Sequence, residues 1–427
     1  MKKFNQSLVV GAMLASLTPI IASAATTAIT NVKVYTSTEQ GVLDSATVVI
    51  EDGHIIAVNA KQSNDSAVIA DNIIDAKGSV LTPGFIGSMN YLGLVEIGQE
   101  KITRDVNAKD ADISFDPSLA FNPKSSAIAF ARKGGISRNI VVPGGGESIF
   151  SGQAIEVELT GHWDSVVATE KAVLVQLGAV HEGSRIIGMQ QLINKLEARQ
   201  TALAADKQAD AKKADAKKAD ATKPPSKEEL LLNAVLAGDI TMVVDVDRAS
   251  DILQLINLKA RFNLDLVLLK AADAIVVAEQ LAAANIPVVM DAMRNLPESF
   301  DSLHNSLDNA GKLSKAGVKV ILATPGDAHG IYGLRYAAGN AVANGMDYNQ
   351  AMASITANVA DIFHLDAGRI ATGKPADMVL WSGDPFEYNS AIQTMWINGE
   401  VQNMQSRQDE LRDRYIQKST MPQAYTQ

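Results

Sequence analysis

The sequence predicts an α/β protein, a TIM-like (β/α)8 barrel joined to a small β-sandwich that the N- and C-terminal segments build together. Short apolar runs alternate with Ala-rich helical stretches through the middle of the chain, which is the rhythm of parallel βα units. Both ends instead carry short β-rich runs separated by tight turns. A chain of 427 residues, 47% hydrophobic and 20% charged, can form a barrel and a smaller module. An open doubly wound sheet is the alternative, because periodicity alone does not separate it from a barrel.

Residues 1–24 have the pattern of a secretory signal peptide. Lys2 and Lys3 precede an apolar run from Leu8 to Ile21, and Ala22-Ser23-Ala24 forms an A-x-A cleavage site. The alternative is an uncleaved anchor helix, but the run is shorter than the ~20 residues that a membrane span needs. We therefore expect cleavage before Ala25 and a periplasmic or secreted protein.

Composition limits the classes of partner. The formal net charge is −10, which argues against nucleic acid or an anionic membrane once the signal peptide is removed. The sequence has no cysteine, so disulfides, a lipid-anchored N-terminal Cys and thiolate metal sites are excluded. A small-molecule ligand remains the expected partner, and the oligomeric state stays open.

Two terminal segments predict one composite β-sandwich, made of residues 28–81 and 368–402. In the first, ITNVKVYTS and ATVVIEDGHIIAVNA are strand-like, and Glu51-Asp52-Gly53 is a turn signal between two β-rich runs. In the second, QTMWINGEV contains an Asn398-Gly399 turn.

The barrel is expected over residues 82–367. Leu81–Gly93, read as LTPGFIGSMNYLG, is its entry, because Pro83 and Gly84 set up a sharp turn into a buried strand. Within the barrel, the segment 203–229 has a near-repeat of Ala, Asp and Lys with no apolar stripe, so it predicts a solvated helix or a tether inserted after IIGMQQLINKLEARQ. Residues 403–427 predict a charged C-terminal tail with a helix from Gln405 on the outside of the protein.

Reacting groups of such a barrel lie at the carboxyl ends of its strands, so the residues after each apolar run are the site candidates. The expected pocket residues follow four of the runs: Asn90, Tyr91, Asp247, Lys270 and Asp291. Asp245 and Arg248 flank Asp247. Asp327 and His329, on the loop after VILATPG, are the catalytic candidates, since His changes charge near neutral pH and a carboxylate can act as a base.

Each candidate also has a structural interpretation. Asp327 has the position of a turn or helix N-cap residue. Asp247 and Lys270 predict a buried ion pair, because buried charges must be paired. The turn Gly144-Gly145-Gly146-Glu147 could present backbone N–H groups to an anion, although a triple Gly is more often only a tight turn. No phosphate-binding GxxxxGK[ST] loop and no G-x-S-x-G elbow occurs in the sequence.

The entry segment resembles that of the metal-dependent amidohydrolases, which carry a Pro-Gly-hydrophobic-Ile-Asp-x-His-x-His pattern at the same place. On that register Gly87 replaces the Asp, and Met89 and Tyr91 replace the two metal-binding histidines. The C-terminal segment resembles the second half of the family's β-sandwich, an I-x-x-G-K-x-A-D-x-V-x-W stretch. The matching residues are Ile370, Gly373, Lys374, Ala376, Asp377, Val379 and Trp381. VDRASDILQLI, QLAAANIPVV and GLRYAAGNAVANGM add a similarity to secreted imidazolonepropionase-like members.

This resemblance implies hydrolysis of a C–N bond by metal-bound water. It also implies that Asp247 and Lys270 occupy positions of later histidine ligands, and that Asp327 matches the family's general base. Because protonated Lys cannot ligate and Met is a soft ligand, we expect no cofactor or one weakly bound, zinc-like divalent metal near Asp247, Asp327 and His329. The expected function is a hydrolase acting on C–N bonds other than peptide bonds, in cyclic or linear amides, with a depleted metal site. The alternative is a catalytically inactive barrel that binds a small molecule or partner.

Overall fold

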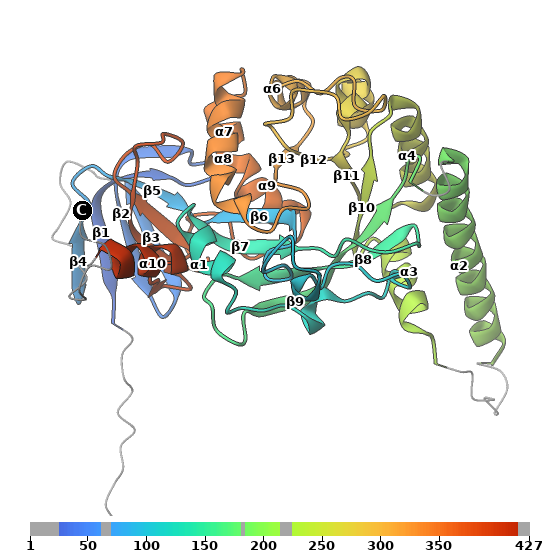
Figure 1. Ribbon diagram of the computed structural model, residues 1–427, viewed down its shortest axis with the longest axis horizontal. Helices are drawn as coiled ribbons and strands as arrows, with labels where there is room; N and C mark the ends of the chain where they lie inside the picture. Colours follow the sequence, from blue (N-terminus) through green and yellow to red (C-terminus); the bar gives the residue numbers. More distant parts are fainter. Residues whose placement is uncertain (1–24, 61–69, 181–183, 214–223, 417–427) are drawn as a thin grey trace, which may run out of the picture.

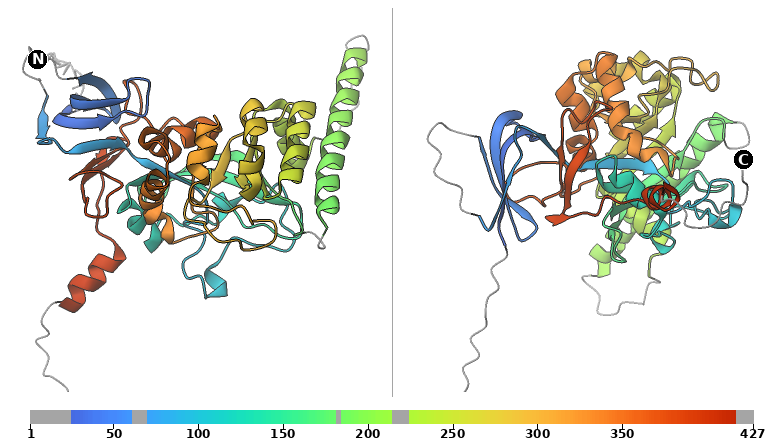
Figure 2. Two further views of the ribbon diagram at one scale, coloured as in Figure 1. Left: turned by 90° about the horizontal axis from the view of Figure 1, so that it is seen from above. Right: turned by 60° about the vertical axis from the view of Figure 1, so that its left-hand side comes forward.

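The computed structural model describes residues 25–60, 70–180, 184–213 and 224–416. Two eight-stranded sheets organise these residues, one at the left of Figure 1 and one at its centre. The long helix α2 lies at the end of the molecule opposite the first sheet (Figures 1 and 2). No described helix is both long and apolar enough to cross a membrane. The predicted signal peptide, residues 1–24, lies outside the described residues.

The first sheet combines both ends of the chain. Its strand order is β16-β15-β14-β5-β1-β2-β3, with β4 paired to β1. The strands are β1 (Thr27–Tyr35), β2 (Val42–Glu51), β3 (His54–Ala60), β4 (Asn72–Asp75), β5 (Val80–Pro83), β14 (Met378–Trp381), β15 (Ile392–Ile397) and β16 (Glu400–Val401). Instead of the two facing sheets of a sandwich, one hydrogen-bonded sheet curls so that Ile55 of β3 donates its N–H to the oxygen of Lys374 at 2.9 Å. Ile55 and Trp396, from opposite parts of the strand order, belong to one apolar cluster.

Two predicted hairpin turns are confirmed. Asp52 and Gly53 have φ values of 47° and 75°, and Asn398 and Gly399 have 49° and 76°. Positive φ at both central residues is the requirement of the type I′ turn of a two-residue hairpin loop, and Asn, Asp and Gly meet it most readily.

The second sheet has the order β13-β12-β11-β10-β9-β8-β7-β6. Its strands are β6 (Phe85–Asn90), β7 (Ile136–Val141), β8 (Phe150–Glu158), β9 (Val166–Gln176), β10 (Thr241–Val246), β11 (Leu266–Lys270), β12 (Val288–Met290) and β13 (Val320–Leu322). Its neighbouring strands are parallel except at β8, which pairs antiparallel with both β7 and β9.

Strand β8 departs from the predicted alternation of strands and helices. Residues 142–149 separate it from β7, and a crossover between parallel strands needs about a dozen residues or more. Gly145 in this loop has a φ of 85° and supports the tight reversal. The third strand therefore enters as a hairpin, and the expectation of a helix after every strand is wrong here.

The second sheet curls around its own interior. One apolar cluster takes residues from all eight strands, which places it in the hollow of the sheet: Ile86, Ile140, Ala154, Leu174, Val243, Val267, Val289 and Ile321. Strands β6 and β13 stand at opposite ends of the strand order, and no ladder joins them among the described residues. At the carboxyl ends of these strands, the N–H of Gly326 donates to the carbonyl oxygen of Met89 at 2.8 Å. The N–H of Tyr91 donates to the carbonyl oxygen of Asp327, also at 2.8 Å. The two edges thus meet at the carboxyl ends of the strands.

Helices cover the sheet and close the hollow at one end. The helices are α1 (Ser126–Arg132), α2 (Arg185–Lys213), α3 (Lys227–Ala237), α4 (Ala249–Phe262), α5 (Ala278–Ala283), α6 (Asn309–Lys315), α7 (Leu334–Ala343), α8 (Tyr348–Ser354), α9 (Ala357–Ile362) and α10 (Arg407–Ile416), with 3-10 turns η1 (Lys101–Thr103), η2 (Pro117–Leu119), η3 (Ala272–Val277) and η4 (Gly330–Gly333). Helix α9 belongs to the interior cluster, and the oxygen of Ile362 accepts from Thr241 Oγ1 at the start of β10. The opposite end, at the strands' carboxyl termini, is the mouth.

The segment 203–229 is helical at both described ends. Helix α2 extends into the segment as far as Lys213. The last three residues of the segment, 227–229, are the first residues of helix α3. Ser226 and Glu229 form a capping box at that helix start. Glu229 also pairs with Arg199 of α2 at 3.2 Å. The packed helix α3 therefore begins at Lys227, so it includes the last three residues of the predicted low-complexity segment. The capping box and the contact with α2 fix the start of this helix.

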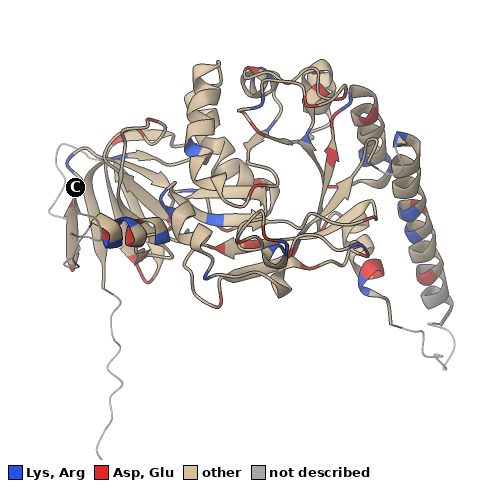
Figure 3. Ribbon diagram, viewed as in Figure 1, with Lys and Arg blue, Asp and Glu red and all other residues tan. Residues whose placement is uncertain are grey.

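The predicted charged C-terminal helix is α10, which has no buried residue and projects from the body in Figure 2. Lys133 Nζ of the α1 C-cap contacts Asp409 Oδ2 at 2.6 Å. Acidic and basic residues are interspersed on both α10 and α2 in Figure 3, as is usual for solvated helix faces.

Candidate functional site

Two adjoining cavities open at the mouth. A cavity of about 70 Å³ lies over the interior cluster, and one of about 430 Å³ lies beside it toward the loops after β9, β10 and β12. Gln176 and Asp245 line both. The polar residues of the smaller cavity are Tyr91, Ser151, Gln176, Asp245 and Lys270.

The centre of the mouth is an ion pair. Lys270 Nζ donates to Asp245 Oδ2 at 2.5 Å, and the two side chains are 32% and 23% exposed. The predicted partner of Lys270 was Asp247, and the structure shows Asp245 instead. The reason is strand alternation: Asp245 follows Val243 onto the inner face, whereas Asp247 lies past the end of β10.

The backbone around this pair is left-handed at residues that rarely adopt that conformation. Lys270 and Ala271 have φ values of 68° and 51°, and Met89 has 56°. Alternation along β11 would direct Lys270 to the outer face with Leu266 and Leu268, which belong to the outer core. The left-handed turn departs from that pattern, and the ammonium reaches Asp245. Such conformations cost free energy and concentrate at functional sites.

Two hydroxyl groups complete the small cavity. Ser151 is 1% exposed, and its Oγ has no hydrogen-bond partner among the described residues. Burial and the charge of Asp245 raise the pKa of the Tyr91 phenol, so it stays a neutral hydroxyl at neutral pH. A Cβ at residue 144 would lie 3.1 Å from the Tyr91 hydroxyl and 2.2 Å from Asn107 Oδ1, so a side chain there would displace Asn107.

Three N–H groups of the glycine turn donate to backbone oxygens of the protein. Gly144 and Gly145 donate to the oxygen of Val106 at 2.7 and 3.3 Å, and Glu147 donates to the oxygen of Lys109 at 3.1 Å. These three donors are engaged within the protein, which favours the interpretation of the segment as a tight turn.

Asp247 lines the larger cavity and stabilises the turn after β11. Its Oδ1 accepts from the N–H of Ala272 at 3.1 Å. Burial raises the pKa of this carboxyl, and the charge of Asp245 adds to that, against the lowering effect of the Ala272 N–H and of Lys270. Asp247 is therefore a turn-capping group close to the ion pair rather than its member.

A second cluster of charges borders the larger cavity. Asp301, on the loop after β12, pairs with Arg185, and Arg248 Nε lies 3.9 Å from its Oδ1. Arg185 Nε also lies 4.0 Å from Asp251. This cluster joins the β12 loop to the starts of α2 and α4 across the edge of the mouth.

The other predicted site residues lie around this centre. Asp291 accepts from Met293 N at 2.8 Å and shares a small cavity with Lys270. Asn90 is fully buried and exchanges two side-chain hydrogen bonds of 2.8 Å with Asn139, so its amide is not among the lining groups. It joins β6 to β7 instead.

Asp327 and His329 are both exposed and lie on the loop after β13. Asp327 Oδ1 accepts from His329 N at 2.8 Å, and His329 Nε2 lies 2.9 Å from the oxygen of Glu96. Neither residue lines the two mouth cavities. The observed contacts are those of a turn, and a catalytic role for the two residues stays a prediction.

A divalent metal is the cofactor that the resemblance implies for the mouth. A zinc or similar site needs three or more converging protein donors. Asp245 is taken by an ammonium group, which repels a metal ion, and Asp247 and Asp327 each bind a backbone N–H. Across the part of the chain that the structure describes, no three His, Cys, Asp or Glu residues are grouped to hold a metal. The residues present do not fit this cofactor.

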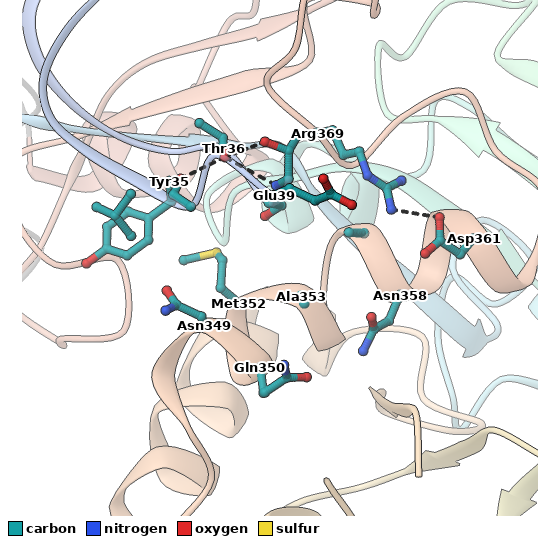
Figure 4. A pocket seen from close by; sticks show the side chains of 15 residues that line it. Tyr35, Thr36, Glu39, Asn349, Gln350, Met352, Ala353, Asn358, Asp361 and Arg369 are labelled. Carbon is teal, nitrogen blue, oxygen red and sulfur yellow. Dashed lines mark hydrogen bonds and ion pairs between the residues drawn. The ribbon is translucent and has the colours of Figure 1, made fainter. Parts of the chain in front are cut away.

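Another cavity, of about 540 Å³, lies elsewhere. It is bounded by the β1–β2 turn and by α8 and α9 (Figure 4). Its guanidinium group, Arg369, already pairs with Asp361 at 2.8 Å. This cavity lies away from the strands' carboxyl ends, where the chemistry of such folds resides, so the mouth is the better candidate.

Sequence reasoning missed Ser151 and Gln176, and it considered Asp245 only as a residue after its strand that could bind a metal if one were present. Ser151 was missed because β8 was not predicted as a strand. The position of Asp245 could have been predicted, because residues two apart on a strand share a face and Asp245 follows Val243 by two.

Known proteins share this fold. Residues 197–406 match the model of the amidohydrolase family. The amidohydrolase from Thermotoga maritima MSB8 shares 22% identity and a TM-score of 0.76, covering 88% of this chain and 99% of that chain. A prolidase complexed with N-methylphosphonate-L-proline shares 14% identity and a TM-score of 0.52, covering 89% and 100%. A zinc-bound adenosine deaminase from Xanthomonas campestris shares 14% identity and a TM-score of 0.50, covering 88% and 92%. At these identities the structures establish the fold alone. No curated protein sequence matches the chain.

Proposed function

The chain belongs to the amidohydrolase superfamily, and from this premise we propose that it is a small-molecule binding protein that holds its ligand at the mouth without metal-dependent turnover. We also propose that its curled sheet acts as a closed barrel, whose carboxyl-terminal mouth is the usual place for a ligand.

One observation carries the binding proposal: the Lys270–Asp245 ion pair occupies the centre of the mouth. In the family resemblance, the position of Lys270 belongs to a metal-binding histidine. The Lys270 ammonium occupies Asp245, which opposes binding of a divalent cation there, while its remaining N–H groups can donate to anionic groups of a ligand. The strained backbone at Lys270 and Ala271 supports a positioned, functional side chain.

The second candidate is hydrolysis of a C–N bond in a cyclic or linear amide, which membership of the superfamily favours. It would use one weakly held metal near Asp247, Asp327 and His329. These three residues face separate partners, namely Ala272 N, His329 N and the oxygen of Glu96. The metal-binding atoms of these residues would have to leave these contacts and converge before a metal could bind.

The test begins with metal content and turnover. The protein is purified without chelator and dialysed, and we expect well under one equivalent of zinc, manganese or iron and little rise in melting temperature with added metal. Hydrolysis is then assayed on a panel of cyclic and linear amides, with and without zinc or manganese. Stoichiometric metal with turnover that Asp327→Asn abolishes would establish the hydrolase instead, because an amide cannot accept the proton from water.

Binding is tested separately by thermal shift with a panel of small polar metabolites. Ligands that act at the mouth should stabilise the wild type and fail to stabilise Asp245→Asn/Lys270→Met, which removes the pair together and leaves no unpaired charge. The matched control is Asp366→Asn/Lys374→Met, which removes an exposed pair of 2.6 Å outside the mouth. The control should behave as the wild type. A panel in which no compound distinguishes the two double variants would contradict the proposal.

A further inference from the structure

Resting on the proposed function, we propose that the ligand of the mouth is a small zwitterion of the α-amino acid class, with its ammonium group beside Asp245 and its carboxylate beside Lys270. The Lys270–Asp245 ion pair would stay intact. The two charged groups of the ligand would lie against it, each beside the protein group of opposite charge.

Both partners retain bonding capacity for such a ligand. A lysine ammonium has three N–H donors, and Lys270 uses one of them on Asp245 Oδ2. Asp245 Oδ1 receives no side-chain hydrogen bond within the described parts of the chain. Because both residues line the same cavity, a ligand there faces a donor and an acceptor at once.

Charge balance selects a ligand that is neutral overall but dipolar. Lys270 and Asp245 already neutralise each other at 2.5 Å. Asp247 interacts electrostatically with both members of this pair and with Arg294, whose charge is opposite to its own. A singly charged ligand would leave a net charge in a partly desolvated cavity, which is costly. A zwitterion places each of its charges beside an opposite one.

The spacing of the two protein charges indicates the spacing in the ligand. Lys270 and Asp245 are in direct contact, so a ligand that pairs with both needs its charged groups close together. In an α-amino acid both groups are attached to one carbon, whereas a long chain separates them in an ω-amino acid. The contact geometry therefore favours the α-amino acid.

The Ser151 hydroxyl and the volumes of the two cavities also suit such a ligand. The Ser151 hydroxyl is buried, without a partner among the described residues, and belongs to the lining of the small cavity. A buried hydroxyl without a partner is unfavourable, and a ligand carboxylate or ammonium group would satisfy it. The small cavity of about 70 Å³ suits the charged groups, and the adjoining 430 Å³ has room for a side chain against Leu177, Val180 and Val246.

The experiment separates zwitterions from their blocked forms. The common L-amino acids are titrated into the full chain by calorimetry at neutral pH. The tightest is then compared with its N-acetyl derivative, an anion, with its amide, a cation, and with its N-acetyl amide, which is neutral. We expect the free amino acid to bind at least about tenfold more tightly than each blocked form. A blocked form that binds as tightly as the free amino acid, or no binding by any of them, overturns the inference.

Variants locate the binding and separate the two proposals. Asp245→Asn/Lys270→Met should lose affinity for the amino acid by at least about tenfold, Ser151→Ala should lose several-fold, and Asp366→Asn/Lys374→Met should lose none. If other small molecules still stabilise the wild type but not the Asp245/Lys270 variant, the mouth binds ligands and only the zwitterion inference fails. If amide hydrolysis with bound metal appears instead, the proposed function itself fails.

Discussion

Arg138 of β7 donates its Nε proton to Asp377 Oδ2 over 2.5 Å, and this buried bond joins the two sheets. Arg138 also contacts Glu156 at 3.1 Å and Glu158 at 2.9 Å. Burial opposes the charge of the guanidinium, but the carboxylates of Asp377, Glu158 and Glu156 raise the pKa of Arg138 above its ordinary value. Asp377 is one of the residues that match the C-terminal family pattern. Its contact with Arg138 gives this position a structural role, which is to join the first sheet to the second.

Removing one member of this network should be severe. Asp377→Ala leaves Arg138 buried beside fewer charges and withdraws the acceptor for the N–H of Asn398. We expect a loss of about 3–5 kcal/mol in the free energy of unfolding, measured by urea denaturation. Asp366→Ala, which breaks the exposed pair with Lys374, should cost less than about 1 kcal/mol. Equal losses in the two variants would show that Asp377 is not a structural centre.

The mouth pair can be measured by a double-mutant cycle. Asp245→Asn and Lys270→Met should show a coupling energy of about 0.5–3 kcal/mol, because the two groups are in contact and half-buried. The same cycle with Asp247→Asn and Lys270→Met serves as the control and should give a smaller value, since Asp247 is bonded to Ala272 N instead. A larger coupling for Asp247 would contradict the assigned pairing.

Asp247 should make stability depend on pH. Burial raises its pKa in the folded protein above the ordinary 3.8. Between these two values the folded state binds a proton that the unfolded state has lost, so this residue's contribution to stability falls as the pH rises through that window. Asp247→Asn keeps an oxygen acceptor for Ala272 N and carries no charge. Its melting temperature should exceed that of the wild type at neutral pH, and the difference should shrink toward pH ~3.8 and below. A difference that is constant with pH would refute the assigned cause.

Deleting residues 206–222 should leave the fold intact. The deletion removes the charged repeat but keeps Leu192 and Leu196, which are buried, and the Ser226–Glu229 capping box. We expect the free energy of unfolding to change by no more than about 1 kcal/mol. Collapse of the fold in circular dichroism and calorimetry would show that the repeat packs on the protein.

Export remains a prediction from the sequence. The run from Leu8 to Ile21 and the Ala22-Ser23-Ala24 site lead us to expect a mature protein that begins at Ala25, in the periplasm or outside the cell. N-terminal sequencing of protein from the periplasmic fraction is the measurement. A cytoplasmic product that still begins at Met1 would rule out the proposed location.

Much of the architecture could be predicted because its signals are local. The Asp52-Gly53 and Asn398-Gly399 turns are encoded by residues that tolerate positive φ, and the strands after Gly84 are encoded by apolar runs. The direction of β8 could not be predicted in this way. An apolar run indicates a strand but carries no record of which neighbour it pairs with or in which direction.

The sequence by itself determined the superfamily resemblance, the two sheets and the loss of histidines at Met89 and Tyr91. Tertiary structure alone decided that Lys270 pairs with Asp245 and not with Asp247, that Asp377 meets Arg138, and that Ser151 shares a cavity with Lys270. Turn conformation and burial periodicity depend on neighbours in the chain, so they can be read locally. Contacts between residues far apart in sequence depend on strand order, register and backbone direction, such as the left-handed turn at Lys270, and these are set only when the whole sheet is assembled.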